Sequence, residues 1–131
     1  MLKIAIIDDE KGILLSLRLF LEMEGYSPLL FSSPREALKT ITQEKADLVI
    51  LDMRMPEMSG EELAIALREN ETTRDIPIIL ISAHETLQEV AARVGAQGIL
   101  EKPFQFDKLG RLIKEITGDH YRQEYLYKNA N

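Results

Sequence analysis

The chain has 131 residues and no cysteine, and its 22 acidic and 16 basic side chains give a formal net charge of -6. This length predicts one domain, and the lack of cysteine excludes disulfides, thiolate zinc sites and cysteine nucleophiles. The chain has no basic run that would favour nucleic acid, and no apolar stretch long enough for a signal peptide or a membrane span. We expect a cytoplasmic protein whose partners are proteins or a cation.

The first half of the chain alternates between strand-like and helix-like segments. Ile4–Ile7 is a continuous apolar run, typical of a strand that is covered on both faces of a parallel sheet. Apolar residues then share a helical face over Ile13–Leu21, and this helix is expected to end at Gly25. A weaker strand at Pro28–Phe31 precedes a second helix, whose start is predicted by the pair Ser33-Pro34.

The same alternation continues through the second half. Strands are expected at Leu48–Leu51, Ile76–Ile81 and, more weakly, Gly98–Leu100. One helix lies between the first two of these strands, and two more are expected to end at Gly95 and Gly118. The five alternations predict an α/β fold: a flavodoxin-like, doubly wound parallel sheet of five strands in the order 2-1-3-4-5, with five helices.

Polar residues follow four of the predicted strands. Asp8 and Asp9 end the first strand, Asp52 the third, Ser82 the fourth, and Lys102 follows the fifth. In the predicted order these strands are adjacent, so the side chains should converge at the carboxyl edge, where such sheets bind ligands. Two carboxylates 4 Å apart repel each other by up to about 4 kcal/mol at an effective dielectric constant near 20.

A cation is therefore needed to offset this repulsion. All-oxygen ligands without His or Cys suit Mg2+. We expect Asp9 and Asp52 as direct ligands, with Asp8 acting directly or through water. A bound cation would attract a phosphate, on which Lys102 and Ser82 could bind oxygen atoms while Asp52 acts as the nucleophile. The expected chemistry is phosphoryl transfer to a carboxylate, in which no general base is evident.

Four short motifs carry a family resemblance. They are the acidic pair Asp8-Asp9, the segment Leu51-Asp52-Met53-Arg54-Met55-Pro56 followed by Gly60, the triplet Ile81-Ser82-Ala83, and the triplet Lys102-Pro103-Phe104. In these motifs the chain resembles the receiver domains of bacterial two-component response regulators. The resemblance covers residues 2–117, while residues 118–131 are expected to extend the last helix or to begin a linker.

The resemblance implies a role for each matching residue. Asp52 would be the phosphoacceptor, Ser82 the switch hydroxyl and Lys102 the phosphate contact, and the Lys102-Pro103 peptide bond would be cis. The Mg2+ ligands would be the oxygen atoms of Asp8, Asp9, Asp52 and the main-chain carbonyl of Arg54. Phe104 and Phe106, which follow, are expected to anchor the last helix to the core.

The family also implies the partners. The phosphodonor would be a sensor histidine kinase or a phosphotransfer protein, and the phosphorylated form would control a downstream protein or an output domain. The domain would speed its own phosphorylation and dephosphorylation, yet act as a signalling protein rather than as an enzyme with a separate substrate. Dimerisation on phosphorylation is common in the family, so a homodimer is compatible with it.

One position departs from the family pattern, and two others are expected to tune the chemistry. Ile99 stands three residues before Lys102, where the family often has Tyr or Phe, so the aromatic side chain that reports phosphorylation to a partner is replaced by a smaller one. Arg54 and His84, each two residues beyond a site residue, would flank the acyl phosphate and control access of water.

Some of these residues also have simpler structural interpretations. Asp8 or Asp9 alone would more often cap the first helix, and Ser82, with Glu85 three residues on, could cap the next one. Two alternative functions stay open: an aspartyl phosphohydrolase, although such enzymes have a D-x-D pattern where this chain has adjacent aspartates, and a receiver-like binding module that works without phosphorylation.

Overall fold

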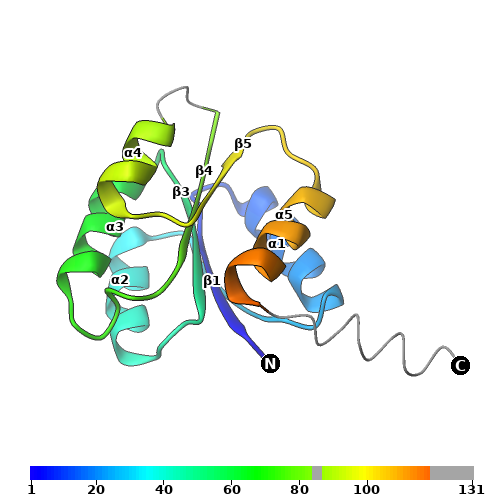
Figure 1. The fold of residues 1–131 in the computed structure, drawn as a ribbon, viewed down its shortest axis with the longest axis horizontal. Helices are drawn as coiled ribbons and strands as arrows, with labels where there is room; N and C mark the ends of the chain where they lie inside the picture. The colour runs from blue at the N-terminus through cyan, green and yellow to red at the C-terminus, as the bar shows by residue number, and fades with distance from the viewer. Residues whose placement is uncertain (84–86, 119–131) are drawn as a thin grey trace, which may run out of the picture.

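The computed structural model describes residues 1–83 and 87–118 (Figure 1). Within these ranges strands and helices alternate from beginning to end. The elements are β1 (Lys3–Ile7), α1 (Lys11–Met23), β2 (Ser27–Phe31), α2 (Pro34–Gln43), β3 (Leu48–Asp52), α3 (Gly60–Glu69), β4 (Ile78–Ser82), α4 (Leu87–Val94), β5 (Gly98–Glu101) and α5 (Phe106–Thr117). His84, Glu85 and the tail from Asp119 lie outside the described residues, so the expectations for them stay predictions.

The strands form one parallel sheet in the order β2-β1-β3-β4-β5. This order confirms the predicted flavodoxin-like topology. In the sheet register Asp52, the last residue of β3, lies beside Ile81, and Ser82, the last residue of β4, lies beside Glu101. The carboxyl ends of β1, β3, β4 and β5 therefore meet along one edge.

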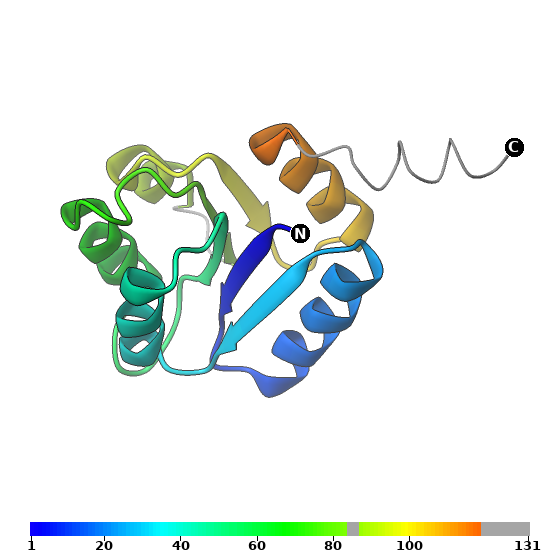
Figure 2. The same ribbon diagram turned by 90° about the horizontal axis from the view of Figure 1, so that it is seen from below.

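Helices cover both faces of the sheet, with α2, α3 and α4 on one face and α1 and α5 on the other (Figures 1 and 2). Alternate strand residues point to opposite faces. Ile7 and Leu51 thus belong to one buried cluster with residues of α2, α3 and α4, while Ile6 and Ile50 belong to another with residues of α1 and α5. Burial on both faces explains why the strands are continuous apolar runs.

Helix ends follow the local signals in the sequence. Ser33 caps α2 by accepting a hydrogen bond from the backbone N–H of Glu36, with Pro34 in the first turn. Gly25 and Gly95 have φ values of 88° and 63°, in the left-handed region that residues other than glycine rarely adopt. Both glycines follow a helix, as predicted. Among the described residues no helix has the length and apolar character needed to cross a membrane.

Two details differ from the sequence-based expectation. β4 begins at Ile78 rather than at Ile76, because Pro77 has no N–H to donate and the N–H of Ile76 is used in a turn with the carbonyl of Thr73. Phe104 packs against the α1–α5 cluster as expected, whereas Phe106 reaches that cluster only through Phe20 and Phe104. Phe106 is 39% exposed, and its ring stacks on Phe20 of α1 with the ring centroids 5.0 Å apart.

Arg68, near the end of α3, joins the connection before β4 to the connection between α4 and β5, mostly through hydrogen bonds to backbone carbonyls. Its guanidinium donates to Val94 and Gly95 at the end of α4, at 2.9 and 2.8 Å, and to Arg74 and Ile76 before β4, at 2.9 and 2.6 Å. A fifth bond, at 3.3 Å, reaches the side chain of Gln97 just before β5. All five guanidinium N–H groups are thereby used.

Candidate functional site

The strand ends bring the predicted side chains to the carboxyl edge of the sheet. Asp8 directly follows β1, Asp52 and Ser82 are the last residues of β3 and β4, and Lys102 directly follows β5. Asp8, Asp52 and Ser82 are buried, with 2%, 6% and 2% of their surface exposed. A buried carboxylate is costly unless it is paired, so the placement of Asp8 and Asp52 calls for a compensating positive charge.

Lys102 supplies part of that compensation. Its Nζ lies 3.4 Å from Oδ1 of Asp52, 3.5 Å from Oδ2 of Asp8 and 3.9 Å from Oε1 of Glu10. One ammonium group is thus shared among three carboxylates from two strand ends. The Lys102-Pro103 peptide bond, which sets the chain direction after this lysine, is cis, as the resemblance implied.

The pKa values at the site reflect this crowding. Burial raises the pKa of Asp8, and this effect outweighs the opposing hydrogen bond from Glu10 and the charge of Lys102. Burial also raises the pKa of Asp52, with a further contribution from the negative charge of Asp8. Burial acts to lower the pKa of Lys102, but the charges of Asp8 and Asp52 outweigh it and the pKa is raised. The site therefore holds excess negative charge.

Three carboxylates after β1 are close enough to share a cation. One oxygen from each of Asp8, Asp9 and Glu10 lies within 4.8 Å of the others. Glu10 was not predicted as a metal-site residue, although its position next to the acidic pair was a visible signal. Within the described residues Asp52 is not in this group, and its Oδ1 is directed to Lys102 instead. Oxygen donors without nitrogen or sulfur fit Mg2+.

The helix-cap interpretation of the acidic pair is wrong in its simple form. The N-cap residue of α1 is Glu10, and its side chain makes no cap hydrogen bond. Asp8 instead accepts a 2.9 Å hydrogen bond from the backbone N–H of Glu10 through Oδ1, which leaves Oδ2 directed to Lys102. The turn after β1 thus orients one oxygen of Asp8 for the backbone and the other for the site.

Gly60, the first residue of α3, allows the helix to start directly against the end of β3. Its N–H donates to the carbonyl of Met53 at 3.0 Å. A Cβ atom at position 60 would lie 2.4 Å from the carbonyl oxygen of Asp52. Ser59 holds the helix start through a capping box with Glu62. These contacts fix the backbone of Asp52 from outside the sheet.

The remaining predicted residues lie around the same edge. Arg54 is exposed and shares with Asp9 the lining of a hollow of about 430 Å3 in the loop after β3. Ile99 is partly buried, lies beside Leu80 in the sheet and packs against the cluster under α2, α3 and α4.

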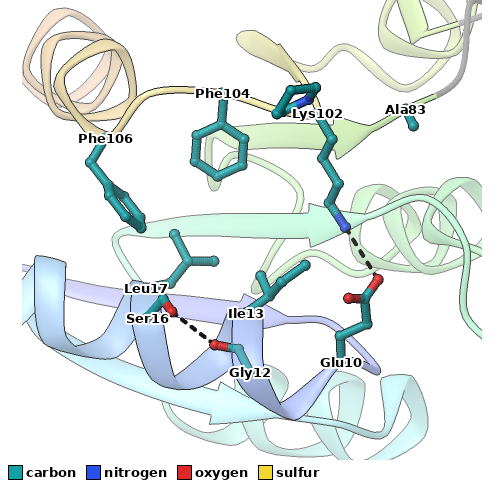
Figure 3. A pocket seen from close by; sticks show the side chains of 10 residues that line it. Glu10, Gly12, Ile13, Ser16, Leu17, Ala83, Lys102, Phe104 and Phe106 are labelled. Carbon is teal, nitrogen blue, oxygen red and sulfur yellow. Dashed lines mark hydrogen bonds and ion pairs between the residues drawn. The ribbon is translucent and has the colours of Figure 1, made fainter.

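A larger pocket, of about 740 Å3, opens on the α1–α5 side of the site (Figure 3). Glu10 and Lys102 lie at one end of it, joined by their ion pair. Ile13, Leu17 and Phe104 give the rest an apolar lining. The acidic edge therefore borders an apolar surface.

A family model described as the response regulator receiver domain matches residues 4–114. The chain belongs to this family. Receiver domains are signalling proteins rather than classical enzymes, and they generally bind Mg2+ at an acidic site. An acidic group, made by Asp8, Asp9 and Glu10, is present in this chain. Response regulators interact with histidine kinases and have output domains.

Curated response regulators are similar in sequence to this chain. The chain is 36% identical over 123 residues to the response regulator MprA of Mycolicibacterium vanbaalenii, covering 89% of this chain and 52% of that protein. It is 37% identical over 115 residues to the phosphate regulon transcriptional regulatory protein PhoB of Pseudomonas aeruginosa, covering 86% and 50%. The chain thus spans about half the length of the curated relatives that it matches.

Solved structures agree with the fold. The chemotaxis protein CheY4 of Vibrio cholerae superposes with a TM-score of 0.83 at 28% identity, covering 88% of this chain and 98% of that one. A response regulator receiver domain protein from Clostridium thermocellum gives a TM-score of 0.81 at 30% identity, covering 96% and 99%.

Proposed function

We propose that this receiver domain accepts a phosphoryl group on Asp52 in a Mg2+-dependent reaction and changes shape to control a downstream partner or output domain. The observation that carries the proposal is the position of Lys102, whose Nζ lies within 3.5 Å of two buried carboxylates at the carboxyl edge of the sheet. An ammonium group in this position can form a charge-assisted hydrogen bond with an oxygen of a phosphoryl group on Asp52.

The donor is a phosphohistidine on a sensor histidine kinase or a phosphotransfer protein. A carboxylate oxygen of Asp52 attacks phosphorus, the new O–P bond forms, and the N–P bond of the donor breaks with its electron pair leaving on the imidazole. Lys102 binds one phosphoryl oxygen and the Ser82 hydroxyl donates to another. Positioning and charge neutralisation are sufficient for this class of reaction, so a dedicated general base is not required.

Mg2+, when bound, neutralises charge on the carboxylates and the phosphoryl oxygens. We assign it to Asp8, Asp9, Asp52 and the main-chain carbonyl of Arg54. Glu10 is an additional candidate, since its carboxylate lies with those of Asp8 and Asp9. Lys102 and the cation then act on the same group of carboxylates.

Phosphorylation shifts an equilibrium between two conformations of the domain. The surface formed by α4, β5 and α5 is the part that repacks, with Ile99 in the place where the family often has an aromatic residue. A cytoplasmic location and dimerisation on phosphorylation belong to the same proposal.

The test is intact-protein mass after incubation with Mg2+ and acetyl phosphate, with wild type beside Asp52→Asn. One phosphate adduct that requires Mg2+ and is missing in the variant is expected. The absence of an adduct in a folded, Mg2+-bound protein would favour the phosphorylation-independent binding module, provided that a cognate kinase also fails to phosphorylate it. Turnover of small phosphomonoesters would favour the phosphohydrolase.

A further inference from the structure

An ion pair connects the start of α3 to α4. Arg93 donates to Glu61 through two nitrogen atoms, with Nε 2.8 Å from Oε2 and Nη2 3.2 Å from Oε1. The paired, fork-like geometry fixes the orientation of both side chains. Of the Arg93 side chain 56% is exposed, against 27% for Glu61. The pair therefore has well-defined geometry, but solvent screening makes it easy to break.

The Glu61 end of this pair is attached to the phosphoacceptor strand. Glu61 follows Gly60, whose N–H is bound to the carbonyl of Met53 and whose Cα faces the carbonyl oxygen of Asp52. Backbone contacts thus lead from Asp52 to Glu61 without passing through Ser82 or Ile99. A displacement of the loop after β3 must change the position of Glu61.

The Arg93 end lies in the last turn of α4. Arg68 holds the C-terminal end of α4 through the carbonyls of Val94 and Gly95. Beside the helix lies a hollow of about 300 Å3, which Arg54, Glu61 and Arg93 line together with Met53, Leu87, Glu89 and Val90. Arg93 directly precedes Val94, so Arg68 and Glu61 hold the same end of α4 and together limit rotation of the helix and its movement relative to α3.

We propose that the Glu61–Arg93 ion pair is a positioning contact that holds α4 in its unphosphorylated arrangement and releases it when the loop around Asp52 rearranges. The inference rests on the proposed function for its link to phosphorylation. A contact made only in the unphosphorylated arrangement lowers the population of the other arrangement, and hence the apparent affinity for any ligand that selects it.

The test of this proposal is a titration of the Mg2+-loaded protein with beryllofluoride, a phosphoryl mimic. Binding is followed by the NMR shifts of backbone amides. Both Glu61→Gln and Arg93→Gln are expected to raise the apparent affinity by about 1.5-fold to fivefold, the range for an exposed ion pair. The two changes alter the net charge in opposite directions, so a general electrostatic effect on an anion would have opposite signs. The double variant should resemble either single one, and the exchanged pair, Glu61→Arg with Arg93→Glu, should return toward wild type.

The matched control is the Arg18–Glu22 pair on α1, which is also exposed and has a 3.4 Å separation. Glu22→Gln and Arg18→Gln should leave the affinity unchanged. Unchanged or lower affinity in both single variants at positions 61 and 93, changes of opposite sign, or additive effects in the double variant would overturn the proposal.

The same variants separate failure of this proposal from failure of the proposed function. If wild type binds beryllofluoride through Asp52 and the variants match it, only the role of the ion pair is wrong. If wild type does not bind beryllofluoride, the restraint on α4 is tested instead by hydrogen exchange of the α4 amides without Mg2+. Faster exchange in both variants, but not in the α1 controls, supports the restraint on α4, and unchanged exchange overturns it.

Discussion

Replacing Gly60 with alanine should disturb Asp52 more than it disturbs the fold. The new Cβ would lie 2.4 Å from the carbonyl oxygen of Asp52 and 2.9 Å from Cα of Met53. Real Cβ atoms keep at least 3.0 Å from such atoms, so the start of α3 and the end of β3 must separate by at least about 0.6 Å. The neighbouring atoms belong to the backbone of Asp52 and Met53, which cannot rotate away as a side chain would.

The displacement sets the expected magnitudes. A misplacement of about 1 Å can reduce a reaction rate by about 100-fold, so a shift of this size should slow phosphorylation of Asp52 by about tenfold or more. Overpacking costs about 1 to 3 kcal/mol in the free energy of unfolding, which for this chain length lowers the melting temperature by about 3 to 15 °C.

Two measurements check this prediction: the rate of phosphate incorporation from acetyl phosphate by intact mass, and the melting temperature. Gly12→Ala is the matched control, because it changes a glycine in the first turn of α1, on the other face of the sheet, and its Cβ would meet nothing within 4 Å. It should leave the rate unchanged and raise stability by up to about 1 kcal/mol. A Gly60→Ala protein with wild-type rate and melting temperature would refute the reasoning.

Three further predictions concern charge and packing. Without metal, Asp8→Asn should raise the melting temperature near neutral pH, because burial raises the pKa of Asp8 and the folded state disfavours its charged form. The gain in melting temperature should fade as pH decreases. A lower melting temperature in the variant near neutral pH would contradict this prediction. Lys102→Gln should tighten Mg2+ binding by about tenfold in calorimetry, since it removes a cation paired with Asp8 and Asp52; weaker binding would count against that view of the site. Arg68→Ala should reduce the free energy of unfolding by about 2 to 4 kcal/mol in denaturant titrations. The control, Arg74→Ala, keeps the backbone carbonyl that Arg68 binds and should cost less than about 0.5 kcal/mol. Equal effects of the two changes would show that the hydrogen bonds of Arg68 to the carbonyls contribute little.

Much of the fold could be predicted because a two-sided parallel sheet leaves a strong pattern. Runs such as Ile4–Ile7 are buried on both faces, and glycines such as Gly95 end helices where a positive φ is required. The convergence of Asp8, Asp52 and Lys102 followed from strand order alone. The start of β4 was predicted two residues too early, because Ile76 is apolar and buried without being part of the strand.

Other features have no pattern that a single sequence could reveal. The partners of Arg68 are mostly backbone carbonyls, which every residue offers, so no side-chain type signals the network. Phe106 lies on an interhelical surface rather than in the core, and hydrophobicity alone does not separate these two places. Glu10 was visible beside the acidic pair, but only the turn after β1 shows that its carboxylate approaches the other two.

The network of Arg68 also limits how this domain can vary. One side chain holds two connections, the one from α3 to β4 and the one from α4 to β5, so the lengths of the two are not independent. An insertion in either connection moves oxygen acceptors out of reach of the guanidinium and weakens the hold on the other connection. Sequence change in the two connections should therefore be correlated in homologues that keep the arginine, and free to drift separately in those that have lost it.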